Sequence, residues 1–349
     1  MAAILTNRAL ALDIALTSRC PLQCRYCSVE RKPQQELSAR QWESVIASFA
    51  RLRRIELISL EGGEPFVRPD LPAILAASLD GSQAVKIVTS GVIPLSYLPE
   101  RLLRNPRFFI ELSMDGPGEF HDFLRDGSWE KAWPFLQAGL ERGVRMRLRS
   151  VISRHNLFIF EGWLTALDRA LEPYGQRVEF SFDTILAPEA MVGEGGEISR
   201  LGLRAYPTQG LLPSTAEIWR LYRNLKCRNF RNLVLLQTEP LRGCGAAAGG
   251  FISFDPPGIF SFCCEAPRRV GSIFHVSAEE CLSRRDISLL TRPCENCPHL
   301  SAALCNGCWT GQKCGMVKYW GAENCQTLVG SMDPGRQPRR RDRGTSLGI

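Results

Sequence analysis

Short apolar runs and longer amphipathic stretches alternate through the first half of the chain. Six of these runs have the apolar and β-branched composition of buried strands. They cover residues 11–17, 55–60, 85–89, 108–115, 145–153 and 177–186. Each run is separated from the next by a stretch that is long enough for a crossover helix. Strands that alternate with helices in this way predict a parallel sheet and an α/β fold.

The unusual residues of this half follow the ends of the predicted strands. Their position favours closure of the sheet into an incomplete, TIM-like (β/α)6 barrel, because such barrels carry their chemistry at the carboxyl ends of the strands. The helix that begins after Ser38 has a capping-box spacing to Gln41. Residues 96–104 also predict a helix. In the helix around residues 135–143, Pro134 either introduces a kink or marks a start at Trp133.

The alternating pattern stops near residue 187, and the chain then changes character. We expect a core domain over residues 1–187 and a bridging segment with one helix over 188–240. From Gly243 to Cys325 there are ten cysteines and too little apolar periodicity for an independent core. We therefore expect a cysteine-rich domain over 241–330 that bound metal organises, followed by a basic, disordered tail over 331–349.

Composition excludes several classes of protein. The chain is 44% hydrophobic and 23% charged, as is usual for a globular protein. It has no run of eighteen apolar residues and no basic, signal-like N-terminus, so we expect a cytoplasmic protein that does not contact a membrane. Five arginines in the last fourteen residues account for much of the net charge of +7. Nothing else resembles a nucleic-acid-binding surface, and no nucleic-acid partner is expected.

Three cysteines lie close together directly after the first predicted strand. Cys20, Cys24 and Cys27 fall within eight residues. Three thiolates can hold three irons of a [4Fe–4S] cluster, which normally takes four cysteines, so the fourth iron stays open to another ligand. A zinc site with a distant fourth ligand and three unrelated thiols are the alternatives.

Four motifs in order then resemble one enzyme family. CPLQCRYC (residues 20–27) resembles the CxxxCxxC signature of the radical S-adenosylmethionine (SAM) enzymes. EGGEP (61–65) is similar to their GGEP loop, and VTSG (88–91) to their TNG turn, with serine in place of asparagine. LSMDGP (112–117), followed by HDFLRDGSWE, looks like the SxDGP…HDxxR segment of one branch. Each motif directly follows a predicted strand. Chance matches would not all fall at such positions, so the placement supports the resemblance.

The resemblance implies both a reaction and a set of binding residues. SAM would chelate the open iron of the cluster, and reductive cleavage would give a 5′-deoxyadenosyl radical that abstracts hydrogen from a substrate. The implied cofactor-binding residues are Tyr26, Gly62, Gly63, Glu64, Pro65, Ser90, Ser113, Asp115 and Arg149. Arg149 would bind the SAM carboxylate or form a structural ion pair.

The cysteine-rich region from Gly243 to Cys325 resembles the SPASM extension, a C-terminal domain that holds two auxiliary [4Fe–4S] clusters. By that resemblance the first cluster takes Cys244, Cys263 and Cys308. The second takes Cys294, Cys297, Cys305 and Cys325. The spacing departs from that of the family, so Cys264 in place of Cys263, or a register through Cys314, stays open. A zinc-ribbon-like module is the structural alternative. Glu265 would be a catalytic base, as in sulfatase-maturing relatives, or a solvated surface residue.

Three functions are open. The favoured hypothesis is a radical SAM oxidoreductase that crosslinks, dehydrogenates or epimerises a peptide or protein substrate, as peptide-modifying maturases do. The second is the same chemistry on a small metabolite such as a sugar, amino sugar or amino acid in natural-product biosynthesis. The third, an iron–sulfur electron carrier or zinc module, leaves GGEP and SMDGP unexplained.

Expected partners follow from the first two hypotheses. The cluster needs an electron donor such as flavodoxin or ferredoxin. The nineteen residues before Cys20 leave no room for a leader-binding domain, so we expect any such domain to be a separate chain.

Overall fold

The computed structural model of this 349-residue chain describes most of the first half and parts of the second. The described residues are 10–27, 29, 34–175, 178–184, 210–211, 213, 215–236, 250–262 and 270–283.

One curved sheet organises these residues, with the spatial order β10-β9-β8-β1-β2-β3-β4-β5-β6-β7. All neighbours from β8 to β7 are parallel, whereas β9 and β10 join by antiparallel pairing. The strands are β1 (Leu10–Thr17), β2 (Ile55–Gly62), β3 (Val85–Thr89), β4 (Phe108–Ser113), β5 (Met146–Ile152), β6 (Val178–Thr184), β7 (Leu233–Leu235), β8 (Phe251–Phe254), β9 (Ile259–Ser261) and β10 (Gly271–Ser272). The six predicted strands are β1 to β6, and they lie side by side in sequence order.

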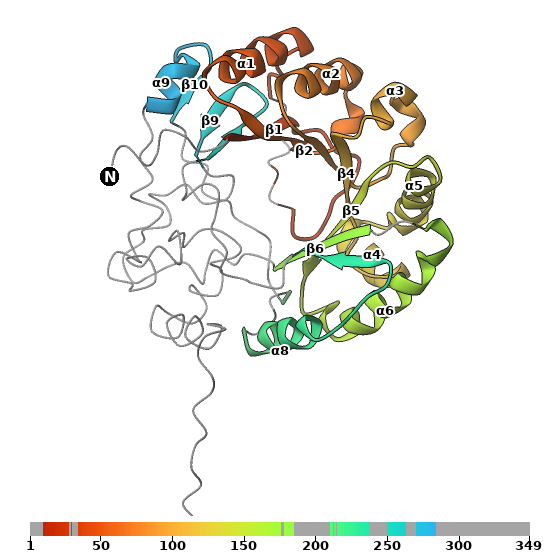
Figure 1. Cartoon of the computed structure of the whole chain (residues 1–349). Coiled ribbons are helices and arrows are strands. Elements are labelled where there is room, and N and C mark those ends of the chain that lie inside the picture. The colour runs from red at the N-terminus through yellow and green to blue at the C-terminus, as the bar shows by residue number, and fades with distance from the viewer. Residues whose placement is uncertain are drawn as a thin grey trace, which may run out of the picture.

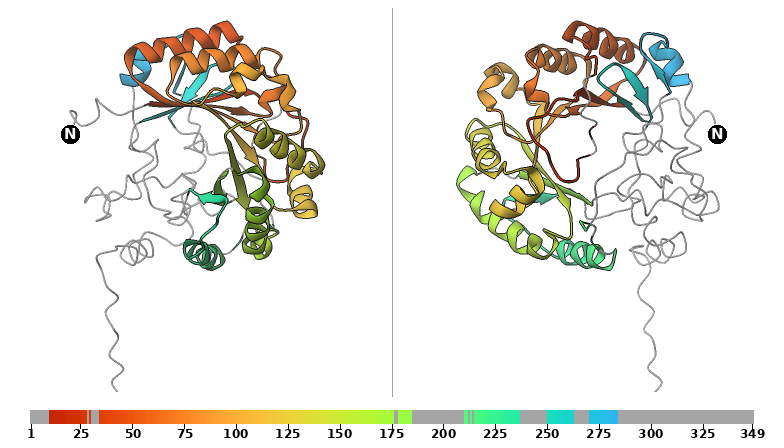
Figure 2. Two further views of the ribbon diagram at one scale, coloured as in Figure 1. Left: turned by 45° about the vertical axis from the view of Figure 1, so that its right-hand side comes forward. Right: turned by 180° about the vertical axis from the view of Figure 1, so that it is seen from behind.

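Helices cover the outer, convex side of this sheet (Figure 1), and the two further views show the same arrangement (Figure 2). They are α1 (Ala39–Leu52), α2 (Leu71–Gly81), α3 (Glu100–Leu103), α4 (Gly118–Arg125), α5 (Trp129–Glu141), α6 (Phe160–Ala170), α8 (Thr215–Lys226) and α9 (Ala278–Ser283). The prediction of an α/β partial barrel is therefore confirmed. None of the helices in the described ranges is long and apolar enough to cross a membrane.

Local sequence determines the start of α1 as expected. The Ser38 hydroxyl accepts a hydrogen bond from the Gln41 amide, and the Gln41 side chain accepts one from the Ser38 amide, which completes the capping box. Trp42, Ile46 and Phe49 then lie on the buried face of the helix. Two other helical predictions need correction. Helix α5 begins at Trp129 and contains Pro134, so a start at Trp133 is wrong.

The predicted helix over 96–104 is divided in two. A 3-10 turn covers Leu95–Tyr97, and α3 begins only after Pro99. Proline has no amide proton and disfavours helical backbone in the residue before it, so the ring at position 99 interrupts the helix.

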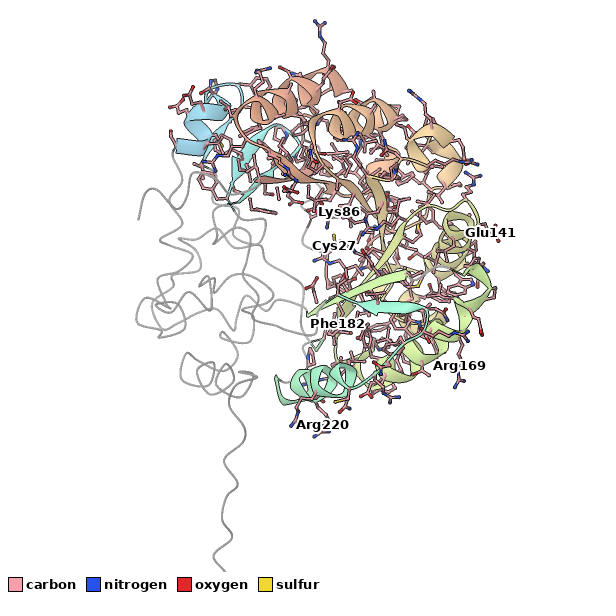
Figure 3. The ribbon with its side chains drawn as sticks, viewed as in Figure 1. Cys27, Lys86, Glu141, Arg169, Phe182 and Arg220 are labelled. Carbon is pink, nitrogen blue, oxygen red and sulfur yellow. The ribbon has the colours of Figure 1, made fainter. Side chains whose placement is uncertain are left out.

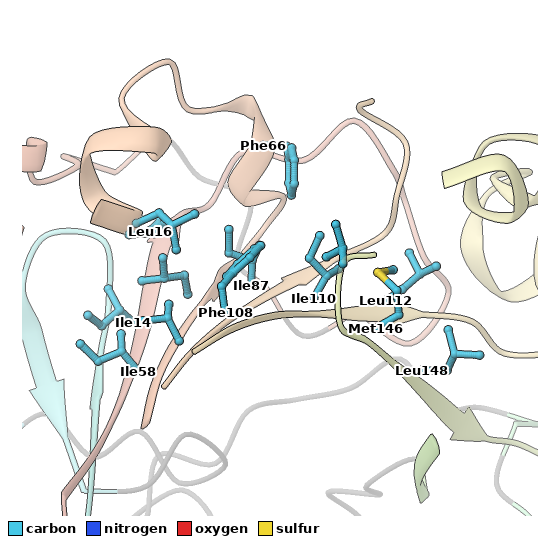
Figure 4. Packing of buried hydrophobic residues seen from close by; sticks show 14 of the residues in the cluster. Ile14, Leu16, Ile58, Phe66, Ile87, Phe108, Ile110, Leu112, Met146 and Leu148 are labelled. Carbon is cyan, nitrogen blue, oxygen red and sulfur yellow. The ribbon is translucent and has the colours of Figure 1, made fainter. Parts of the chain in front are cut away.

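The sheet has two chemically different faces. On the outer face Ile14, Ile58, Ile87 and Ile110 are completely buried beneath the helices (Figure 4). Side chains alternate along a strand, so the charged neighbours of these residues point to the inner face. This alternation is what gives the barrel an apolar shell and a polar interior.

The strands β8, β9 and β10 extend the sheet beyond β1. β8 pairs in parallel with β1, and α9 packs beside α1. This part of the 241–330 segment therefore rests on the barrel, although the sequence grouped it with the cysteine-rich region. Its strands are only two to four residues long, which is too short to reveal strand periodicity. The division of the chain into domains stays a prediction.

Candidate active site

The loops after β1 and β2 meet at the carboxyl end of the barrel. The Gly63 amide donates to the Thr17 carbonyl oxygen at 2.7 Å, and the Glu64 amide donates to the Arg19 carbonyl oxygen at 2.9 Å. An added Cβ on Gly63 would lie 2.1 Å from that Arg19 oxygen, so this contact requires glycine. Gly62 has a φ of +119° and needs glycine as well. The GGEP turn is thereby fastened to the cysteine loop, and Pro65 begins a buried 3-10 turn behind it.

Cys20, Cys24 and Cys27 lie on the loop that follows β1, each partly exposed and outside any disulfide bond. Figure 3 shows Cys27 on the concave side of the sheet. Burial raises the pKa of Cys24 to about 11, and the neighbouring Cys27 and Cys20 contribute to the rise, so the three thiols influence one another. In the described part of the chain no three His, Cys, Asp or Glu side chains are gathered to hold a single metal ion.

A cluster is a better match to these thiols than a single ion. Each cysteine of an iron–sulfur cluster binds a different iron, so its ligands do not share one metal. The thiols share one loop, and the adjoining turn is packed so closely that only glycine is accommodated. The residues present thus fit a three-cysteine cluster with one open iron.

Glu64 is completely buried, and its carboxylate is used inside the protein. One oxygen accepts hydrogen bonds from the Ser90 amide at 2.9 Å and the Ser90 hydroxyl at 2.6 Å. The other accepts from the Thr89 hydroxyl at 2.8 Å and the Phe66 amide at 3.3 Å. Burial raises the pKa of this carboxyl, and the hydrogen bonds oppose the rise. Glu64 therefore ties the turn after β2 to the turn after β3, and a role as a ligand for SAM stays untested.

Asp115 is also completely buried and connects three elements. Its Oδ2 accepts hydrogen bonds from the Tyr26 hydroxyl and from Arg125 Nε, the latter at 2.6 Å. Its Oδ1 accepts from the Val151 amide at 2.7 Å. The side chain predicted to face SAM thus holds the cysteine loop, through Tyr26, against α4 and β5.

His121 binds the backbone amide of Asp115, whereas Tyr26 and Arg125 bind its side chain. Its Nδ1 accepts the Asp115 amide at 3.3 Å, which leaves Nε2 to donate to the Ser128 hydroxyl at 2.9 Å. Burial, aided by the charge of Arg125, lowers the pKa of His121 to about 4, so the ring is neutral. Asn156 donates to the Asp115 carbonyl oxygen at 2.7 Å. His121 and Arg125 belong to the segment HDFLRDGSWE, and their four-residue spacing is the signal that places both on one helix face, although no role was predicted for either.

Ser113 and Arg149 occupy neighbouring positions in β4 and β5. Ser113 is buried. Arg149 forms ion pairs with Glu111 at 3.3 Å and with Asp183 at 2.7 Å. The ion-pair alternative for Arg149 is therefore observed, and a role in binding the SAM carboxylate stays a prediction.

The inner wall of the barrel carries further paired charges. Lys86 on β3 binds Glu111 at 3.0 Å, and Lys86 lies on the concave side in Figure 3. Arg147 binds Glu179 at 2.7 Å on the next strands. On β1, burial and the charge of Glu61 raise the pKa of Asp13 well above its usual range. Charged residues at alternate positions of apolar strands are the signal that could have identified this wall.

The predicted auxiliary ligands lie outside the described residues. These are Cys244, Cys263, Cys294, Cys297, Cys305, Cys308 and Cys325, together with the alternatives Cys264 and Cys314 and the candidate base Glu265. Their roles stay predictions.

Comparison with known families and proteins agrees with this geometry. Residues 14–158 match the model of the radical SAM superfamily. The PqqA peptide cyclase of Granulibacter bethesdensis is 32% identical over 148 residues, which cover 41% of this chain and 39% of that protein. The Fe-coproporphyrin III synthase of Methanosarcina barkeri is 28% identical over 147 residues, which cover 41% of this chain and 37% of that protein. The alignment thus spans less than half the length of these curated relatives.

A solved structure extends the likeness in fold beyond this region. The structure described as native anSMEcpe with bound AdoMet and Cp18Cys peptide matches with a TM-score of 0.64 and 16% identity. The match covers 93% of this chain and 99% of that one. At this identity the likeness concerns the fold. The domain match and the enzymes among the relatives support the prediction that the chain is an enzyme.

Proposed function

The chain carries a radical SAM domain over residues 14–158, and on this premise we propose that it abstracts hydrogen from a peptide or protein substrate. When bound, the cluster and SAM supply a 5′-deoxyadenosyl radical by one-electron reduction. The single observation that carries the proposal is the direct hydrogen bonding of the GGEP turn to the cysteine loop. It joins the two parts that such a reaction needs, the iron ligands and a backbone surface for the cosubstrate.

The residues of this chain have separate tasks in the proposed reaction. Cys20, Cys24 and Cys27 hold the cluster. The glycines of the turn let it pack directly against the cysteine loop, so that the turn lies beside the cluster, where SAM would bind. Ser113 and Arg149 are paired in register on the adjacent strands β4 and β5, and Arg149 would bind the SAM carboxylate beside its partners Glu111 and Asp183.

Two observations support a peptide substrate. Similar proteins include a PqqA peptide cyclase, and a structure of similar fold contains a bound peptide. The inner wall is also lined by ion pairs, including Lys86–Glu111 and Arg149–Asp183. Such a wall offers both donors and acceptors to polar backbone groups. Crosslinking, dehydrogenation and epimerisation are all compatible with this surface.

A small metabolite is the second candidate. The specific observation in its favour is the similarity to an Fe-coproporphyrin III synthase, which is nearly as close as that to the peptide cyclase. The same hydrogen abstraction would then act on a sugar, an amino acid or another natural-product precursor.

Further components belong to the proposal. Two auxiliary [4Fe–4S] clusters in the cysteine-rich region would accept an electron after hydrogen abstraction, with Glu265 as the base. A flavodoxin or ferredoxin would reduce the first cluster, and a separate protein would bind a leader segment if the peptide has one.

Anaerobic reconstitution tests the proposal. The protein is loaded with iron and sulfide, supplied with SAM and dithionite, and 5′-deoxyadenosine is measured with peptide or small-metabolite fractions of a host extract. The comparison variant carries Cys20→Ala, Cys24→Ala and Cys27→Ala. Cys227→Ala is the matched control, because Cys227 is an exposed cysteine outside the site.

The outcomes separate the hypotheses. We expect 5′-deoxyadenosine from the wild type and from Cys227→Ala, and none above background from the triple variant. Stimulation by the peptide fraction supports the first candidate, whereas stimulation by the metabolite fraction alone supports the second. A fully iron-loaded wild type that forms no 5′-deoxyadenosine with any fraction would refute both.

A further inference from the structure

The cysteine loop is anchored through the one aromatic side chain that lies between its second and third cysteines. The Tyr26 hydroxyl donates to Asp115, and the Arg125 guanidinium lies 5.3 Å from the centre of the Tyr26 ring. Arg125 Nε donates to the same Asp115 oxygen at 2.6 Å. All three side chains are at least 90% buried. The loop is therefore held by a buried network and not by solvent-exposed contacts alone.

Arg125 brings a permanent positive charge close to the cysteines. The residues on either side of Arg125 bind the loop on either side of Cys24: the Arg25 amide donates to the Leu124 carbonyl oxygen at 3.0 Å, and the Gln23 amide donates to Asp126 Oδ2 at 2.9 Å. Arg125 also forms an ion pair with Asp115 at 2.6 Å, and the field of its guanidinium reaches the loop at Cys24. In a buried setting such a field is only weakly screened by solvent.

Resting on the proposed function, we propose that Tyr26 and Asp115 position the cysteine loop, and that the buried charge of Arg125 raises the reduction potential of the cluster held there. Reduction adds negative charge to a cluster. A fixed cation nearby stabilises the reduced form more than the oxidised form, so the potential rises. Arg125 thus acts as a positioning and tuning residue, through Asp115 and through its charge.

The loop also offers a matched control. Arg25 lies between Cys24 and Cys27, but it is exposed. Its guanidinium rests 4.1 Å over the Phe123 ring, and its Nε donates to the Phe123 carbonyl oxygen at 2.7 Å. Water and salt screen a charge in this position. Arg25→Gln removes the same charge as Arg125→Gln, from the same loop region but from an exposed site.

The test is an EPR-monitored redox titration of the reconstituted protein without SAM or substrate. We expect Arg125→Gln to lower the equilibrium constant for cluster reduction about tenfold, which equals about 59 mV for one electron. Arg125→Lys should recover most of this loss. Arg25→Gln should change the constant less than about twofold. Equal potentials for wild type and Arg125→Gln, or equal shifts for the two glutamine variants, would overturn the tuning role.

Two further variants keep the test decisive if Arg125→Gln does not fold. Asp115→Asn/Arg125→Gln removes both charges, and the potential should still fall, by less than in the single variant. Tyr26→Phe keeps both charges, so its potential should stay unchanged. In cluster-free protein, however, amide hydrogen exchange of residues 20–27 should accelerate at least threefold. Unchanged exchange would overturn the positioning role. A wild type without any reducible cluster would instead refute the proposed function.

Discussion

Glu64 and Glu111 are both almost fully buried carboxylates, at 0% and 3% exposure, yet their surroundings are opposite. Glu64, at the end of β2, is held by two hydroxyls and two backbone amides. Glu111, in the middle of β4, is held by Lys86, Arg147 and Arg149. Burial raises the pKa of Glu64, whereas the cations around Glu111 overcome its burial and lower that pKa to about 2.

The difference separates two tasks in one barrel. At the end of the barrel beyond β2, Glu64 ties two turns together through neutral donors, and no fixed cation is added at that carboxylate. Along the inner wall, cations and carboxylates are paired across strands and present a charged surface to a substrate. Three substitutions and one acid titration test whether the surroundings of Glu64 and Glu111 differ in this way.

Glu111→Gln should have the largest effect on stability. It removes the negative charge that Lys86 and Arg149 share, and we expect the free energy of unfolding to fall by about 3 kcal/mol. Urea denaturation at pH 7 measures the loss. Glu100→Gln is the control, because Glu100 pairs with Arg104 on the surface and should cost about 0.3 kcal/mol. Similar losses for both variants would show that the inner pairs are no stronger than surface pairs.

The pH dependence of stability should show the contribution of the Glu111 carboxylate charge. The folded pKa of Glu111 is lowered from 4.5 to about 2, so its contribution is present above pH 4.5 and is lost as the pH falls through 2. The full contribution is about 3 kcal/mol. Urea unfolding of wild type and Glu111→Gln between pH 2 and pH 6 measures it. The difference between the two proteins should grow with pH, and a constant difference would contradict the assignment.

Local sequence specified the strand ends well, because each motif depends on a short segment. The GGEP turn requires glycine through a contact with the neighbouring loop, and the Ser38 capping box needs only four residues. The alternation predicted the parallel sheet, and the motifs at the strand ends predicted its closure into a partial barrel. These features are encoded by neighbours in the chain.

The charged network could not be predicted in the same way. Asp115 was assigned to SAM, but its partner Arg125 is identified only when α4 folds back over the loop. The sequence allows two roles for Arg149, because its ion-pair partner Asp183 lies on another strand. The pairing of β8 with β1 joins residues about 240 positions apart, and no local pattern records such a contact.

Glu64→Gln should have a smaller cost with the opposite pH dependence. The amide has one acceptor oxygen in place of two, so a buried donor such as the Ser90 amide loses its partner, at about 2 kcal/mol. The folded pKa of Glu64 is raised, so the wild type has its full contribution below pH 4.5 and loses it as the pH rises through the folded pKa. The cost of Glu64→Gln should therefore shrink with rising pH in urea unfolding. If the loss of stability in Glu64→Gln grew with rising pH, the folded pKa of Glu64 would be lowered and not raised, as it would be by a neighbouring cation.

Thr89→Val should have the smallest effect, because it removes one of the four donors to Glu64 and keeps the shape of the side chain. The Thr89 hydroxyl donates at 2.8 Å and also accepts from the Gly91 amide at 3.1 Å, so we expect a loss of about 1 kcal/mol in urea unfolding at pH 5. Thr165→Val is the control, since its hydroxyl donates only to the Glu161 carbonyl oxygen of its own helix. The Thr89 bond lowers the pKa of Glu64, so its removal should also move the pH-dependent loss of stability to higher pH. If the stability of Thr89→Val fell without that shift, Glu64 would be held by packing and not by its neutral donors, and the contrast with Glu111 would fail at the strand end.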